Sequence, residues 1–312
     1  MKERIQRFLR PAGFILAALC IVGLLAFSAR STNTTPVKEL AVEVDAPEGV
    51  HFIDENVVRE QVLAATDAVI GASIGDVDLV AIEEGLRSIG CVANANVYHT
   101  MDGTLHVRVT QREPIARVIN ADGSGFYIDR EGWTMPLSAD YTARVLVISG
   151  SLFEPFALTA PVDVLHAADS LRSSVHSDEI HLLARTISAD PTWNALFDQA
   201  VVNASGEFEL IPRIGGQRIR IGRLNGTEVG STGDAAFTLN QRLEKLRNFY
   251  AQGIPQTDWR MYAVIDTRFA DQVVCTRRAD YRPPTRPRTT SATPATAQNT
   301  TRPRQNAARP AH

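Results

Sequence analysis

The first thirty residues constrain this chain most, because a short basic head runs directly into a long apolar segment. Residues 1–11 contain one acid, Glu3, and four bases, Lys2, Arg4, Arg7 and Arg10, whereas residues 12–29 contain no charge. A helix over 12–29 would be roughly 27 Å long, close to the ~30 Å hydrocarbon core of a bilayer. We therefore predict one transmembrane helix over 12–29. Its cytoplasmic head is 1–11, since positive charge favours the cytoplasmic side, and the rest of the chain lies outside the cytoplasm.

A cleavable signal peptide is the alternative interpretation. Small residues Ala26 and Ser28 flank Phe27 as they would at a cleavage site. The apolar run is longer than the roughly 7 to 15 residues of a typical signal peptide core, and Arg30 follows it. These features favour a retained anchor, and both interpretations export the remainder of the chain.

Net charge differs strongly along the chain. The whole has a formal charge of -3; removing the +4 of residues 1–30 and the +6 of the six arginines after Asp280 leaves -13 on residues 31–281. A folded region with so much negative charge is poorly suited to nucleic acid, which is itself an anion. We therefore expect no nucleic acid among the partners.

Residues 38–111, after a Ser/Thr/Pro linker over 30–37, follow the order strand, helix, helix, strand, strand. Alternating apolar residues predict the strands: one carries Leu40, Val42 and Val44, and two others form a hairpin about Asp102-Gly103, with Ala93, Ala95, Val97, Leu105, Val107 and Val109 on the buried side. This order predicts an α+β unit with two helices on one face of a three-stranded sheet.

Capping residues delimit the two helices of this unit. Asp54 and Asp78 are suited to the N-cap position, and Gly90 is suited to a left-handed residue just past the end of the second helix. The buried faces would carry Val58, Val62 and Ala65 in the first helix, and Leu79, Ile82, Leu86 and Ile89 in the second.

A change of pattern at Pro114 predicts a domain boundary, with a larger β-rich domain and flanking helices over 112–281. Its predicted strands are 115–120, 125–129, 145–149, 201–202, 208–211, 218–221, 261–269 and 272–276. One helix buries Ile180, Leu183, Ala184 and Ile187, and a last helix, capped by Asp234, buries Leu239, Leu243, Leu246 and Tyr250. Residues 282–312 contain mainly Arg, Pro, Thr and Ala, so we predict a disordered tail.

Residue groups that would signal catalysis or a cofactor are missing from the sequence. There is no glycine-rich phosphate loop, no Gly-x-Ser-x-Gly elbow, no Cys-x-x-Cys and no His-Glu-x-x-His. His166, His176 and His181 are interpreted as surface residues, and Gly215-Gly216 as a turn. Only three cysteines are present, so no dense disulfide framework is encoded, although a bridge between Cys91 and Cys275 stays open. We expect no enzyme, no cofactor, no metal and no small-molecule substrate.

The sequence resembles the bacterial cell-division FtsQ/DivIB family. The likeness is carried by Val107-Arg108-Val109-Thr110-Gln111-Arg112-Glu113-Pro114-Ile115-Ala116, Tyr127-Ile128-Asp129-Arg130-Glu131-Gly132, Arg218-Ile219-Arg220-Ile221-Gly222, Val264-Ile265-Asp266-Thr267-Arg268-Phe269 and Gln272-Val273-Val274. The chain departs from the family pattern at Gly90-Cys91-Val92, where the family often has Pro-Trp-Val, and at Leu146-Val147-Ile148-Ser149-Gly150, a reduced Leu-Pro-x-x-x-Gly element. The resemblance implies that 38–111 is a POTRA domain and 112–281 the FtsQ/DivIB domain.

The resemblance also implies a non-enzymatic scaffold of the septum-forming complex, in the inner membrane at the division site. Its implied partners are FtsB-like and FtsL-like single-span proteins and other division proteins. A closing strand at a sheet edge has unpaired backbone groups to which a partner segment can add. The candidate partner-binding residues are Arg268, Phe269, Asp271, Gln272, Val273 and Val274, although Val273 and Val274 could equally pack in the core. Arg268 would pair a partner carboxylate or hold the preceding turn.

Two other protein classes are alternatives. A POTRA-type assembly factor would need a following barrel of many alternating strands, and the chain after Thr276 has none. An exported cell-wall hydrolase would need convergent catalytic groups, which the sequence lacks. Both fit the sequence less well than a scaffold.

Overall fold

The computed structural model describes residues 18–22, 35–65, 69–156, 160–166, 176–224, 235–253, 258–269 and 272–282. Residues 18–22 are helical, but within the described ranges no helix has the length and apolar character needed to cross a bilayer. Most of the predicted transmembrane segment 12–29 lies outside these ranges. So do the alternative cleavage site at Ala26 to Ser28 and the predicted tail from 283 onward.

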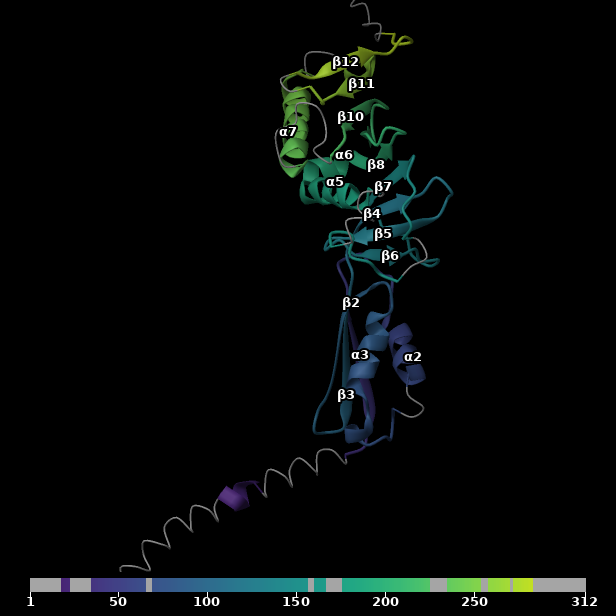
Figure 1. Ribbon diagram of the computed structural model, residues 1–312, viewed down its shortest axis with the longest axis vertical. Helices are drawn as coiled ribbons and strands as arrows, with labels where there is room; N and C mark the ends of the chain where they lie inside the picture. Colours follow the sequence, from purple (N-terminus) through teal and green to yellow (C-terminus); the bar gives the residue numbers. More distant parts are fainter. Residues whose placement is uncertain are drawn as a thin grey trace, which may run out of the picture.

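The smaller of two folded units contains a three-stranded sheet with two helices on one face (Figure 1). Its sheet has the order β1-β3-β2, with β1 parallel and β2 antiparallel to β3. The predicted α+β arrangement is therefore confirmed. In chain order the elements are β1 (Glu39–Asp45), α2 (Glu55–Ala65), the 3-10 turn η1 (Ile74–Asp76), α3 (Leu79–Arg87), β2 (Val92–His99) and β3 (Thr104–Gln111).

Both predicted N-caps of this unit are confirmed. Asp54 Oδ1 accepts a hydrogen bond from Val57 N at 2.9 Å, and Asp78 Oδ1 accepts one from Ala81 N at 3.0 Å. Each carboxylate thereby satisfies a backbone N–H that the first helical turn leaves unpaired. The predicted burial of Ala65 is wrong, because α2 ends there and the side chain is exposed.

Gly90 is needed for packing and not for a left-handed backbone, so the predicted role is wrong. Helix α3 ends at Arg87, and Gly90 does not have a positive φ. A Cβ atom at Gly90 would lie 2.3 Å from Cδ of Pro136, which ends β6 (Thr134–Pro136) of the larger unit. Glycine therefore permits the close approach of the two units.

The predicted register of the hairpin is wrong at its first residue. A bulge between Val92 and Asn94 buries Val92 and exposes Ala93, whereas Ala95 and Val97 are buried as predicted. A bulge adds one residue to one strand, so it reverses the side-chain alternation across it. A sequence pattern of small residues does not reveal where that extra residue lies.

The larger unit is built on a nine-stranded mixed sheet with the order β12-β11-β10-β9-β8-β7-β4-β5-β6. Parallel pairing occurs in β4–β7, β7–β8 and β10–β11. The short strand β6 was not predicted. The other strands are β4 (Pro114–Ile119), β5 (Gly125–Asp129), β7 (Leu146–Gly150), β8 (Phe197–Val202), β9 (Phe208–Pro212), β10 (Arg218–Gly222), β11 (Tyr262–Asp266) and β12 (Val274–Arg277).

Helices lie along one face of this sheet (Figure 1) and bury its core. They are α5 (Ser177–Ala189), α6 (Pro191–Leu196) and α7 (Ala235–Asn248), followed by the π-helical turn η2 (Phe249–Gly253) and the 3-10 turn η4 (Trp259–Met261). The predicted buried residues of α5 and α7 all pack in this core, Tyr250 partly, whereas the predicted cap Asp234 lies outside the described residues.

Of the three histidines interpreted as surface residues, His181 is buried and His176 is half-buried. His181 is 3 % exposed, and its Nε2 lies 2.9 Å from the carbonyl oxygen of Arg130. His176 is half-buried, with Nδ1 2.7 Å from Glu179 Oε2. Only His166 is exposed as predicted. Burial of His181 follows from its position on the sheet-facing side of α5, which its polar side chain does not indicate.

A buried ion pair joins the end of the small sheet to the start of the large one. Arg112 Nη1 donates to Asp129 Oδ2 at 2.8 Å, and these side chains are 9 % and 0 % exposed. The Arg112 guanidinium also lies over the Trp133 ring, 4.9 Å from its centroid, while Trp133 N donates to Asp129 Oδ1 at 2.6 Å. Tyr127 and Met135 of the large sheet pack into the core of the smaller unit. The two units therefore share one continuous junction.

Candidate partner-binding edge

Strand β12 forms one end of the nine-stranded sheet and, within the described ranges, pairs only with β11. In Figure 1 it lies at the end of the folded part opposite to the smaller unit. Among the described residues, no side chain or loop bonds its backbone apart from that of β11. A strand in this position exposes a row of backbone donors and acceptors to solvent.

The other sheet edges have some of their backbone groups occupied. Beside β6, Thr134 N donates to Val162 O at 2.9 Å, and Trp133 forms a bridge with Asp163. Beside β2, the α3 side chains of Arg87 and Glu83 bond Ala95 O and Val97 N, both at 2.8 Å. Arg59 bonds Leu40 O of β1 at 3.0 Å. Within the part of the chain that the structure describes, β12 is therefore the least protected edge.

The predicted binding residues near β12 fall on two faces. Gln272 and Val274 are exposed, the latter 39 %, whereas Val273 and Cys275 are half-buried against the core of the large unit. Thus Val273 packs against the core and Val274 is exposed, although the sequence allowed core packing for both residues. Phe269 is 44 % exposed, and Asp271 lies outside the described residues.

Arg268 holds the chain after β11 in place. Its Nε donates to Asp266 Oδ1 at 3.0 Å, its Nη2 to Asp266 Oδ2 at 2.7 Å, and its Nη1 to Glu207 Oε1 at 2.6 Å. Both carboxylates come from this chain, so Arg268 is placed to hold this turn, and its pairing with a partner carboxylate stays a prediction. Because Asp266 is in register with Val274, the same network fixes the start of β12.

Charge pairing shifts the pKa values of this network. Burial alone would raise the pKa of Asp266, but the hydrogen bonds and charge of Arg268 outweigh it and lower that pKa. The pKa of Glu207 is lowered by its hydrogen bond from Asn203 and by the Arg268 charge, and the pKa of Arg268 is raised by Asp266. All three groups therefore remain ionised at neutral pH.

Two further residues that were not predicted secure the same turn. Lys245 of α7 donates from Nζ to Thr267 O at 2.8 Å and also to Phe269 O. Thr267 N and Oγ1 both bond Arg220 O of β10, at 3.1 and 2.9 Å. Thr267 lies within the Asp-x-Arg segment that the sequence singled out, but nothing near Lys245 in the sequence signals its contact.

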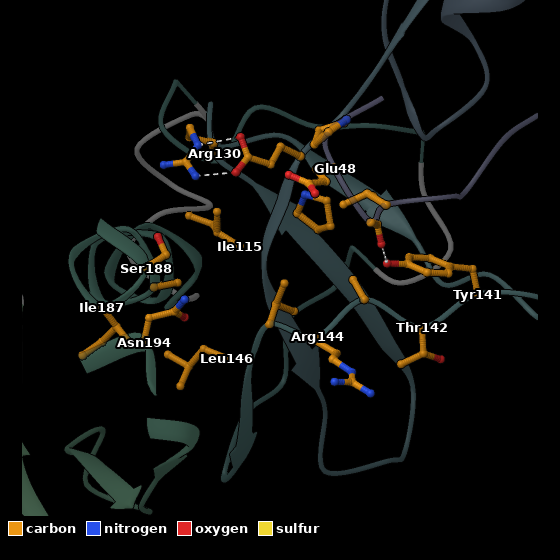
Figure 2. Close-up of a pocket in the computed structure, with 18 residues that line it drawn as sticks. Glu48, Ile115, Arg130, Tyr141, Thr142, Arg144, Leu146, Ile187, Ser188 and Asn194 are labelled. Atoms are coloured by element: carbon orange, nitrogen blue, oxygen red, sulfur yellow. Dashed lines mark hydrogen bonds and ion pairs between the residues drawn. The ribbon is translucent and has the colours of Figure 1, made fainter. Parts of the chain in front are cut away.

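A cavity of about 690 Å³ lies at the junction of the two units and lacks a catalytic arrangement among its described residues (Figure 2). Its Glu113 and Arg130 pair with each other, and Tyr141 Oη donates to Gly49 O at 2.5 Å. No cluster of metal-ligating side chains occurs in the described ranges, and Cys91 and Cys275 are both free thiols, so the bridge between them is not formed.

Comparison with known proteins gives matches over both units. A family model described as "FtsQ/DivIB, C-terminal related" matches residues 113–276, and a POTRA-like domain model matches residues 36–110. The cell division protein FtsQ of Rhodothermus marinus is 28% identical over 224 residues, which is 70% of this chain and 71% of that protein.

Proposed function

Because this chain belongs to the FtsQ/DivIB family of cell-division proteins, we propose that it is a non-enzymatic scaffold that binds other division proteins through the open edge of β12. The observation that supports this site is the contrast between the edges: the backbone of β12 has no partner but β11 among the described residues. A partner strand can add there through backbone hydrogen bonds.

Side chains beside the edge would set which partner fits. Val274 and Phe269 present apolar surface, while Gln272 supplies a polar contact. Alternating side chains of an added strand meet alternating sites, so a partner segment with apolar residues at every second position suits this edge. FtsB-like and FtsL-like single-span proteins are the proposed partners, and the Arg268 network keeps the edge preformed.

Replacing Val274 with proline is expected to weaken partner binding about tenfold or more, because proline lacks the N–H and its ring disrupts an added strand. Pull-down of the FtsB-like partner by the full chain in detergent measures this. Val274→Thr keeps the backbone donor at the same position and is the matched variant, with a smaller expected loss. Unchanged pull-down by a folded Val274→Pro protein would refute the edge-strand site.

Arg242 of α7 is not a suitable surface control for this experiment. Arg242 is 4 % exposed, and its Nη1 donates to Ile221 O at 2.6 Å and Arg223 O at 3.0 Å. Its loss would leave buried carbonyl groups unpaired. Gln241, the exposed neighbour on α7, is the appropriate position, and Gln241→Ala is expected to leave binding unchanged.

The proposed scaffold is anchored in the inner membrane by one helix over 12–29, with residues 1–11 cytoplasmic. The intact protein is therefore expected to remain with washed membranes after alkaline carbonate extraction, since buried apolar residues hold a spanning helix in the bilayer. Immunoblotting of pellet and supernatant measures this. Complete release into the supernatant would contradict the anchor and favour a cleaved signal peptide.

A further inference from the structure

Apolar side chains protrude from one end of the smaller unit. Met101, in the turn between β2 and β3, is 82 % exposed, and Ile70, between α2 and η1, is 54 % exposed. Val80, in the first turn of α3, is 62 % exposed. Apolar residues that are exposed singly need no explanation, whereas several at one place mark a contact surface. We call these three residues the tip.

Backbone hydrogen bonds bring the loops of Met101 and Ile70 to the two sides of one short segment, Val37-Lys38. Gly103, two residues after Met101, accepts the backbone N–H of Lys38 at 2.8 Å. Gly71, next to Ile70, donates its N–H to the carbonyl oxygen of Val37 at 2.8 Å. The two apolar side chains therefore flank the point at which the chain enters this unit. That end of the unit faces away from the larger unit (Figure 1).

The start of the folded chain fixes how far the tip can lie from the proposed membrane anchor. The carbonyl oxygen of Thr35 accepts the N–H of Ile74 in η1 at 2.9 Å, so the chain is held by the unit from Thr35 onward. Residues 30–34 lie between this point and the apolar segment 12–29. Five residues extend at most roughly 18 Å. Lipid headgroups occupy about 5–7 Å on each side of the hydrocarbon core, so the tip is within reach of them.

We propose that the tip inserts into the headgroup region of the lipid bilayer, and this rests on the proposed function, in which residues 12–29 anchor the chain. Apolar side chains bind at the boundary of headgroups and acyl chains in proportion to the apolar area they bury. Tyr98, near the end of β2, is 44 % exposed and stacks on His106 with ring centroids 5.0 Å apart. Tyrosine is enriched at membrane–water interfaces. A second contact beside the anchor would restrict pivoting of the unit and hold the β12 edge, at the opposite end of the folded part, away from the membrane (Figure 1).

Charge does not attract this end of the unit to anionic lipid. The exposed base Lys38 is accompanied by the exposed acids Glu39, Asp76 and Asp102. The hydrogen bond from Thr100 Oγ1, 2.5 Å long, lowers the pKa of Asp102, so this carboxylate stays ionised and keeps its water. Contact with the bilayer therefore depends on the apolar side chains, and it extends only to the hydrated headgroup region.

Photo-crosslinking of the full chain tests the proposal, with a single copy held in each nanodisc of zwitterionic phosphatidylcholine. The photoreactive residue p-benzoylphenylalanine replaces Met101, and in a control protein it replaces Val57, which is 49 % exposed in the first turn of α2. Val57 lies at the other end of the unit, where Ile53 N donates to Gln111 Oε1 at the end of β3.

After irradiation, mass spectrometry of the intact protein is expected to find a phosphatidylcholine adduct from position 101 at a level about fivefold or more above that from position 57. Absence of this adduct, or equal adducts from both positions, would overturn the proposal. So would adducts that form only after anionic phosphatidylglycerol is added, because charge would then be their cause.

A charge at the second residue of the tip separates apolar insertion from mere proximity. With the probe at position 101, Ile70→Glu keeps the anchor and residues 30–34, and it is expected to reduce the lipid adduct about fivefold because an ionised group resists dehydration. Val57→Glu is the matched variant and is expected to leave the adduct unchanged. An undiminished adduct in Ile70→Glu would mean that the short connection alone brings position 101 to the lipid, and it would overturn the proposal.

Size-exclusion chromatography of the same samples tests the anchor separately. A chain that elutes with the nanodiscs but forms no lipid adduct at position 101 would refute insertion of the tip alone. A chain that does not elute with the nanodiscs would refute both the anchor and the tip. No division partner is present, so neither result depends on the β12 site.

Discussion

Replacing Asp129 with alanine is expected to lower the free energy of unfolding by about 3–5 kcal/mol, because the variant leaves the buried Arg112 without a counter-charge. Asp129 is fully buried, and it also accepts the backbone N–H of Trp133. Asp129→Asn keeps that acceptor but removes the charge, so it isolates the ionic part of the loss. Urea unfolding of the chain in detergent, followed by tryptophan fluorescence, measures each difference.

A neighbouring ion pair on the same two strand ends supplies the matched control. Glu113 and Arg130 pair in the same way, but their side chains are 40% and 42% exposed. Solvent screens an exposed pair, so Glu113→Ala is expected to cost about 1 kcal/mol or less. Equal losses for Asp129→Ala and Glu113→Ala would show that burial of the Arg112 pair does not govern the stability of the junction.

Replacing Gly150 with alanine is expected to destabilise the fold by about 3 kcal/mol. Gly150 has a φ of +119°, which disfavours any side chain, and a Cβ atom there would lie 2.1 Å from the carbonyl oxygen of Val202. That oxygen belongs to the backbone of β8, paired with β7 at this position, and it cannot move aside alone. The same urea titration measures the loss.

Gly123 separates the two causes of the Gly150 effect. It also has a positive φ, +86°, but a Cβ atom there would have no neighbour within 4 Å. Gly123→Ala is therefore expected to cost only the backbone term, about 1–2 kcal/mol. Equal losses in the free energy of unfolding for Gly150→Ala and Gly123→Ala would contradict this explanation, because they would mean that a Cβ atom at Gly150 does not clash with the carbonyl oxygen of Val202.

Local patterns were sufficient for most elements of the fold. Asp54 and Asp78 each act within three residues of their own position, so the sequence alone indicates the starts of α2 and α3. The hairpin turns at Asp102-Gly103 and Asp122-Gly123 are likewise local, and both glycines have positive φ. The short strand β6 was missed, because three residues are too few to show an alternating pattern.

Long-range packing explains two of the incorrect predictions. Gly90 was assigned to the end of the preceding helix, but the residue that requires a glycine there is Pro136 of the larger unit. His181 was assigned to the surface because it is polar, but its ring bonds the carbonyl oxygen of Arg130, fifty-one residues away in the chain. Whether an edge strand is open to a partner also depends on contacts between distant residues. The side chains of Arg59, Arg87 and Glu83 bond backbone atoms of the edge strands β1 and β2, whereas no described side chain bonds the backbone of β12.

The sequence by itself determined the α+β order, the family resemblance and the segment that contains the candidate site, because periodicity and turn residues act over a few positions. Only the tertiary structure decided that Val274 is exposed while Val273 packs half-buried against the core, and that Arg268 is held by Asp266 and Glu207. These features depend on which distant segments pack together, and burial and charge pairing between distant residues have no local pattern that could predict them.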